Sequence, residues 1–199
     1  MFRFLQRKSR CREIYFHEDD YCQQQFLPME SMAHVVAELK TIDEFSDAHR
    51  VPGGFGWTDI DVRQEGPVEL RTLKIKREDF AAVVSPFMPA FDVVYTGYSS
   101  YRKKCERTAA WGRSQLCAFF ANWDEDGTIA HVWANLFDRE EDSIRAASKT
   151  AAAIGRIHQL VYVDWAWGYK CVASEEEIFT STLRTKFNSI AENAKKRRT

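Results

Sequence analysis

The feature that most constrains the fold of this chain is a pair of apolar segments joined by an acidic turn. Residues 116–123 and 128–137 are rich in aromatic and aliphatic side chains, and Asp-Glu-Asp-Gly separates them. Asp-Gly is a preferred pair in tight hairpin turns, because glycine readily adopts the positive φ that such turns need. We therefore predict an antiparallel β-hairpin over residues 116–137.

A helix is predicted directly after this hairpin. Asp138 is a suitable N-cap, and Glu141 is placed for a reciprocal capping box. Residues 160–172 then predict one aromatic strand, and Ser174 with Glu177 predicts the capped start of a last helix. The helix after the hairpin has an apolar stripe made largely of alanine: Ile144, Ala147, Ala151, Ile154 and Ile157.

The first half of the chain shows a similar order of elements. Residues 13–17 and 21–27 predict a second hairpin around an acidic turn. Ser31 is a suitable cap for a helix that ends before Pro52, and its apolar residues recur at helical spacing. Residues 68–75 alternate between apolar and polar side chains, which predicts a strand.

A short helix and another strand follow in this half. Residues 77–84 predict the helix, and residues 91–98 are strand-like. Residues 99–113 are polar and basic, which favours a connector or a short helix.

Together these patterns predict an α+β protein with antiparallel sheets and helices packed on one face. The chain has 199 residues, the size of a single globular domain spanning 1–199. The repeated order of elements also suggests an internal duplication. In this hypothesis two diverged ββαβα units lie at 12–90 and 116–196, with a connector at 91–115.

The distribution of charge favours a basic partner. Nine of the 28 basic residues lie within residues 1–12 and 195–198, whereas all 29 acidic residues lie between Glu13 and Glu192. The body therefore carries 19 positive and 29 negative charges, a net charge of −10. Such a body makes nucleic acid an unfavourable partner and suits a basic protein. The alternative is that these charges only keep the surface solvated.

The cysteine pattern favours free thiols in a reducing cytoplasm. The number of cysteines is odd and no C-x-x-C pair occurs, which disfavours both disulfides and a zinc site: Cys11, Cys22, Cys105, Cys117 and Cys171. No apolar run reaches about 18 residues, so we expect no membrane association. Residues 1–12 lack the apolar core and cleavage pattern of a signal peptide.

The common signatures of enzymes are not found in the sequence. It contains no phosphate-binding P-loop, no dinucleotide-binding glycine motif, no nucleophile elbow and no zinc-protease motif. We therefore assign no catalytic residue and no metal or other cofactor, and the sequence favours a binding protein over an enzyme.

Two acidic turns are candidate binding sites. One comprises Glu18, Asp19 and Asp20 next to His17, and the other comprises Asp124, Glu125 and Asp126. Carboxylates beside an imidazole can bind a cation or a basic partner. The alternative is a pair of ordinary solvated turns, since aspartate is a common turn residue.

Aromatic residues mark two further candidate sites. Trp57 precedes Asp59 and Asp61 in a glycine-rich loop, and the two carboxylates share a face if the loop is extended. Trp165 and Trp167 also share a face in the predicted strand, where they could fill the core or anchor a ligand. Cys117 and His131 lie on facing strands, and we expect both to serve core packing.

Three functional hypotheses follow from the sequence. The first is a non-enzymatic protein-binding domain, such as a bacterial inhibitor or immunity-type protein that masks a basic partner. The second is a small metal-assisted hydrolase that uses carboxylates near His17 or Asp59. The third is a small-ligand-binding domain with an aromatic pocket.

Overall fold

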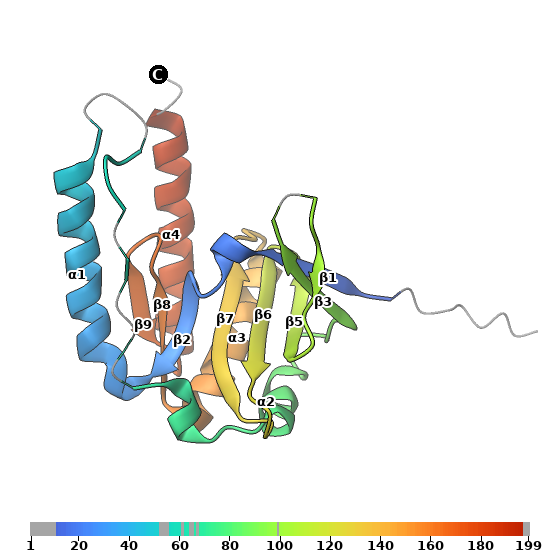
Figure 1. Cartoon of the computed structure of the whole chain (residues 1–199). Helices are drawn as coiled ribbons and strands as arrows, with labels where there is room; N and C mark the ends of the chain where they lie inside the picture. The colour runs from blue at the N-terminus through green and yellow to red at the C-terminus, as the bar shows by residue number, and fades with distance from the viewer. Residues whose placement is uncertain are drawn as a thin grey trace, which may run out of the picture.

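The computed structural model describes residues 11–51, 56–60, 62, 63, 66, 68–98 and 100–196. Its strands form two sheets, with orders β1-β3-β4 and β5-β6-β7-β2-β8-β9 (Figure 1). The strands are β1 Glu13–His17, β2 Gln24–Pro28, β3 Val93–Gly97, β4 Lys103–Lys104, β5 Thr108–Ser114, β6 Cys117–Trp123, β7 Ile129–Leu136, β8 Leu160–Asp164 and β9 Tyr169–Val172. The helices are α1 Met32–His49, α2 Arg77–Val84, α3 Glu141–His158 and α4 Glu176–Lys196. The predicted α+β class is confirmed.

The hairpin over residues 116–137 is confirmed as β6 and β7. The two strands pair from Cys117 with Leu136 to Asn122 with His131, and the acidic turn joins them. Gly127 has φ 78°, which is the conformation that favours glycine in this turn.

The predicted hairpin over residues 13–27 is wrong. β1 pairs in parallel with β3, whereas β2 lies between β7 and β8 in the larger sheet. The reason lies in burial. Four of the five β2 residues are buried, so this strand needs neighbours on both edges and cover on both faces. β1 buries alternate residues and covers one face only.

Three other predictions for strands and connectors are corrected. Residues 70–73, within the predicted strand 68–75, form a 3₁₀ helix that ends at Lys74 with positive φ. Residues 160–172 are two strands rather than one, joined by a turn in which Gly168 has φ 69°. Residues 99–113 contain β4 and most of β5, because small residues there pair with β6. The duplication of 12–90 and 116–196 stays a prediction.

The core is divided by the larger sheet. One face packs against α2, α3 and α4, and the other face is covered by α1 at one end and by the small sheet at the other (Figure 1). The alanine stripe of α3 is buried as predicted up to Ile154, but Ile157 is 59% exposed. Gly155 extends the close packing, since a Cβ there would lie 2.4 Å from Ser174 N.

The predicted helix cap at Asp138 is also corrected, and the one at Ser31 is corrected in part. α3 begins at Glu141 with Glu140 as its N-cap, and the Asp138 carboxylate instead accepts hydrogen bonds from Glu140 N at 3.1 Å and Ser143 Oγ at 2.8 Å. Ser31 does occupy the N-cap position of α1, as predicted, but its side chain makes no capping hydrogen bond, and its hydroxyl donates instead to Val68 O at 3.4 Å. Asp138 lies two residues before the actual N-cap, so it cannot close the predicted box, because the chain stays extended until Glu140.

A charged pair is buried between the larger sheet and α4. Lys186 Nζ lies 2.6 Å from Asp164 Oδ2, and the two side chains are 1% and 0% exposed. Lys186 also donates to Leu136 O at 3.0 Å, and its ammonium lies 4.3 Å from the Phe137 ring centre. Burial lowers the pKa of Lys186, while the attraction of Asp164 opposes that shift.

Candidate functional site

A cleft of about 380 Å³ lies between the β2–β7 part of the larger sheet and residues 63, 66 and 68–71. We call it the polar cleft. His34 from α1 and Trp165 from the end of β8 complete its wall. Its polar lining residues are Tyr21, Cys22, Gln25, His34, Arg63, Glu69, Arg71 and His131.

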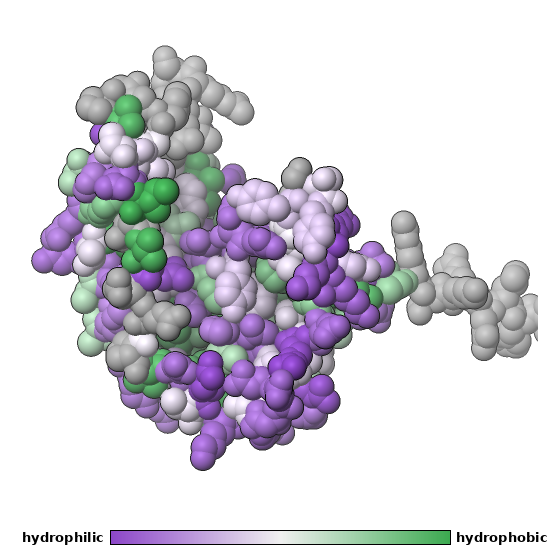
Figure 2. Space-filling model, viewed as in Figure 1, coloured by the Kyte–Doolittle hydropathy of each residue, from purple (hydrophilic) through white to green (hydrophobic). Residues whose placement is uncertain are grey.

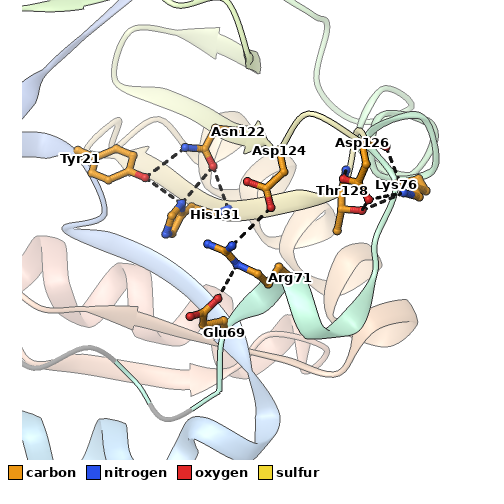
Figure 3. A network of polar contacts seen from close by, with 9 residues as sticks. All are labelled: Tyr21, Glu69, Arg71, Lys76, Asn122, Asp124, Asp126, Thr128 and His131. Atoms are coloured by element: carbon orange, nitrogen blue, oxygen red, sulfur yellow. Dashed lines mark hydrogen bonds and ion pairs between the residues drawn. The ribbon is translucent and has the colours of Figure 1, made fainter.

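One wall of the polar cleft holds a hydrogen-bonded cluster of three side chains (Figure 3). Asn122 and His131 face each other across β6 and β7, and Tyr21 reaches them from the turn before β2. The Tyr21 hydroxyl lies 2.9 Å from His131 Nδ1 and accepts from Asn122 Nδ2 at 3.2 Å. Burial raises the pKa of Tyr21 above its ordinary value, so this group stays a neutral phenol.

The mouth of the polar cleft is marked by an ion pair on the 3₁₀ helix. Arg71 Nε lies 2.5 Å from Glu69 Oε2, and Arg71 Nη1 lies 3.7 Å from Asp124 Oδ2 (Figure 3). The Arg71 and Glu69 side chains are 52% and 57% exposed. The 3₁₀ helix holds Arg71 close to the turn between β6 and β7.

A second arginine lies deeper in the polar cleft. The Arg63 guanidinium is 4.5 Å from the centre of the Trp165 ring, and Trp165 Nε1 donates to Gln25 Oε1 at 3.3 Å. Burial lowers the pKa of Arg63, and the negative charge of Glu38 counters this shift. The result is a partly desolvated cation stacked on an indole, a favourable arrangement for a planar guanidinium.

The thiol that lines the polar cleft is not activated. Burial raises the pKa of the Cys22 thiol to about 12, so it stays protonated at neutral pH. Each arginine has a carboxylate nearby, so neither sign of charge dominates the cleft. The arrangement therefore suits a ligand that carries both signs of charge, or several hydrogen-bonding groups, rather than a simple anion.

Each carboxylate in the turn of Asp124, Glu125 and Asp126 has a cationic partner. Its three carboxylates pair in order with Arg71 at 3.7 Å, Arg107 at 3.0 Å and Lys76 at 3.2 Å. Hydrogen bonds from the backbone and side chain of Thr128 lower the pKa of Asp126 to about 2. These contacts reduce the charge that the turn can offer to a basic partner.

The turn of Glu18, Asp19 and Asp20 forms a short 3₁₀ helix instead of a converging cluster. His17 Nδ1 accepts from Asp19 N at 3.2 Å, and the Tyr98 hydroxyl donates to Asp19 Oδ2 at 3.0 Å. The imidazole and Asp19 are thus used to hold the turn. In the part of the chain that the structure describes, no group of three or more His, Cys, Asp or Glu side chains could hold a metal ion.

The glycine-rich loop is described in part. Trp57 is exposed, and its backbone forms an isolated antiparallel β-bridge with Arg50. Asp59 Oδ1 accepts a hydrogen bond from Ile60 N at 2.8 Å. Asp61 lies outside the described residues. Arg63, from the end of the same loop, lines the polar cleft, so the loop contributes to the site through a residue that the sequence analysis did not select.

The predicted row of Trp165 and Trp167 is not formed. Trp165 is buried and lines the polar cleft, whereas Trp167 is 36% exposed in the turn between β8 and β9. Cys117 and His131 are not cross-strand partners, since Cys117 pairs with Leu136 and His131 pairs with Asn122. Burial raises the pKa of Cys117 to about 11, as expected for a core thiol.

Comparisons of the chain with protein-family models, curated proteins and solved structures found no match. All five cysteines are free. Among the helices that the structure describes, none is long and apolar enough to cross a membrane.

Proposed function

We propose that the protein binds a small zwitterionic molecule in the polar cleft, without catalysing its conversion. The observation that carries this proposal is the Arg71–Glu69 pair at the mouth, which presents both signs of charge beside a cavity of about 380 Å³. Cavities of this volume fall within the range of small-molecule sites, roughly 300–1,000 Å³.

A zwitterion can replace the internal partner of each charge. An exposed ion pair contributes about 0–1 kcal/mol, so it opens at little cost. The ligand carboxylate would then accept from the Arg71 guanidinium, and the ligand ammonium would donate to Glu69. The Tyr21–His131 wall and the Arg63–Trp165 stack would contact the rest of the ligand.

Two lining groups support binding over covalent chemistry. The Cys22 thiol has its pKa raised to about 12, and the Tyr21 phenol has its pKa raised as well. A nucleophile or general base needs a pKa near the working pH, which neither group has.

The test is a thermal-shift screen of free amino acids, followed by calorimetry. For any amino acid that raises the Tm, the N-acetyl and carboxamide derivatives are measured too. We expect each derivative to bind about tenfold more weakly, about 1.4 kcal/mol, because it lacks one charge. Arg71→Ala should abolish the preference for the carboxylate over the amide, and Glu69→Ala the preference for the free amine.

The matched control is the Lys40–Glu44 pair of α1, which is exposed and whose two residues are not among those that line the polar cleft. Lys40→Ala and Glu44→Ala should leave both preferences unchanged. The proposal is wrong if no amino acid raises the Tm, or if Arg71→Ala/Glu69→Ala binds as tightly as the wild type.

Binding of a basic protein is the second candidate, and an exposed apolar segment favours it. Trp57, Ile60 and Val62 are 56%, 84% and 76% exposed. Figure 2 shows hydrophobic side chains along the segment that runs beside α1. Asp43, Glu44 and Asp47 of α1 are also exposed, which would suit a basic partner. An inhibitor or immunity-type role would use this surface.

A photo-crosslinking residue at Ile60, compared with one at the exposed Ile178 of α4, tests the second candidate. In cells we expect one basic protein crosslinked at position 60 and not at position 178. Equal labelling at both positions, or labelling at neither, would contradict it. The five free thiols support a cytoplasmic location for either function.

A further inference from the structure

The small sheet presents a face of tyrosines and cations that the polar cleft does not use. Tyr15, Tyr95 and Lys104 lie side by side across its three strands, because they are partners in the strand registers. The opposite face carries Ile14 and Val94, which are buried against the larger sheet. Tyr15 and Tyr95 are therefore on the outer face, where both are half-buried.

The turn between β3 and β4 adds to this face. Tyr98 and Tyr101 are 55% and 62% exposed, and the sequence continues with Arg102, Lys103 and Lys104, all exposed. The Arg102 guanidinium lies 5.1 Å from the centre of the Tyr15 ring. Figure 1 shows β3 and the hairpin turn projecting beyond the larger sheet. We name the four tyrosines, together with the three cations at this edge of the small sheet, the tyrosine–lysine face.

The cations of this face differ from those near the polar cleft. Arg71, Lys76 and Arg107 each pair with a carboxylate of the acidic turn. Across the described ranges, no ion pair involves Arg102, Lys103 or Lys104. Asp19, in the turn after β1, accepts a hydrogen bond from the Tyr98 hydroxyl at 3.0 Å. All three cations are exposed at the same edge of the small sheet: Lys104 shares the face of Tyr95 and Arg102 lies over Tyr15, whereas Lys103, the partner of Thr96, projects from the opposite face of the edge strand.

We propose that the tyrosine–lysine face binds single-stranded nucleic acid. Three cations at one exposed sheet edge can contact the phosphates of a flexible strand, and exposed tyrosine rings match unstacked bases, each of which has a π-face. A duplex hides these base faces, and an anionic membrane has no rings to stack on the tyrosines. The net charge of −10 on the body opposes distant phosphates, so we expect a short site and modest affinity.

The test measures the anisotropy of fluorescein-labelled dT₁₂ and rU₁₂ with the full chain at 25–200 mM salt. Three phosphate contacts predict a slope of about −2 for log K against log salt concentration, since single strands give roughly −0.7 per contact. Arg102→Ala/Lys103→Ala/Lys104→Ala should bring the slope close to zero. Tyr101→Ala should weaken binding about tenfold with the slope unchanged, because stacking carries no counterion release.

The control variant removes three exposed cations elsewhere: Lys149→Ala/Arg156→Ala/Lys170→Ala, from α3 and β9. It has the same net charge as the triple variant and should bind like the wild type. Circular dichroism of each variant checks that the fold is kept. The proposal fails if neither oligonucleotide binds at 25 mM salt, or if the control triple weakens binding as much. It also fails if heparin or phosphatidylserine vesicles bind equally well and Tyr101→Ala has no effect on dT₁₂.

Discussion

Two ion pairs in this protein have opposite surroundings. Lys186 and Asp164 are enclosed between the larger sheet and α4, with 1% and 0% of their side chains exposed. Arg71 and Glu69 lie at the mouth of the polar cleft, with half or more of each side chain in water. The atoms are equally close in both pairs, at 2.6 Å and 2.5 Å.

The difference shows that the distance between the charged atoms does not determine how much an ion pair contributes to stability. A buried charge has lost its water and depends on its partner, so removing either side leaves an uncompensated charge. An exposed charge can exchange its partner for water or for a ligand at little cost. We therefore assign the buried pair to stability and the exposed pair to recognition.

The largest expected effect comes from breaking the buried pair. Lys186→Met should lower the free energy of unfolding by about 3–5 kcal/mol, because Asp164 would remain buried without its cation. Urea unfolding followed by circular dichroism measures this change. Lys186→Met/Asp164→Asn should recover much of the loss, since the amide keeps an acceptor for Trp167 N, now 3.2 Å from Asp164 Oδ1. The matched variant Arg71→Met should cost less than about 1 kcal/mol. Equal losses of unfolding free energy in Lys186→Met and Arg71→Met would contradict the distinction between the buried pair and the exposed pair.

A smaller effect, with a defined pH dependence, is expected at the exposed acidic turn. The pKa of Asp126 is about 2 in the folded protein, below its ordinary value of 3.8. The folded state therefore favours the ionised carboxyl, and its contribution is present above pH 3.8 and is lost as the pH falls toward 2. Asp126→Asn should be less stable than the wild type at pH 7, and the difference in urea midpoint should shrink between pH 4 and pH 2. A difference that stays constant over this range would contradict the assigned role of the charge.

The elements that the sequence predicted well carry their own local signals. The β6–β7 hairpin has Asp-Gly at its turn, and α3 has an apolar stripe that its burial confirms up to Ile154. The pairing of β2 has no local signal, because its partners Val132 and Tyr162 come more than 100 residues later. A short polar break after β1 resembled a hairpin turn, but the burial of β2 on both faces decided the pairing.

The candidate site was harder to predict for the same reason. Of the residues predicted from the sequence, Trp165 lines the polar cleft, and the predicted loop leads to Arg63, which lines it too. No sequence motif marks Arg71, Glu69 or Tyr21 as functional residues. They line the same cleft because the 3₁₀ helix holds the first two there and because β2, which follows Tyr21, lies inside the larger sheet. The acidic turn was selected for its charge, yet its charge is largely compensated by cations from other segments.

The strand order also determines the sequence in which the strands can pair during synthesis on the ribosome. β2 leaves the exit tunnel long before its two neighbours β7 and β8, because its partners Val132 and Tyr162 are more than 100 residues further along the chain. The apolar side chains of β2 therefore stay without strand partners while those residues are synthesised. β6 and β7, by contrast, need only each other and a short turn. Nascent chains should form this hairpin first and close the sheet around β2 late, in the interval when a chaperone would be most useful.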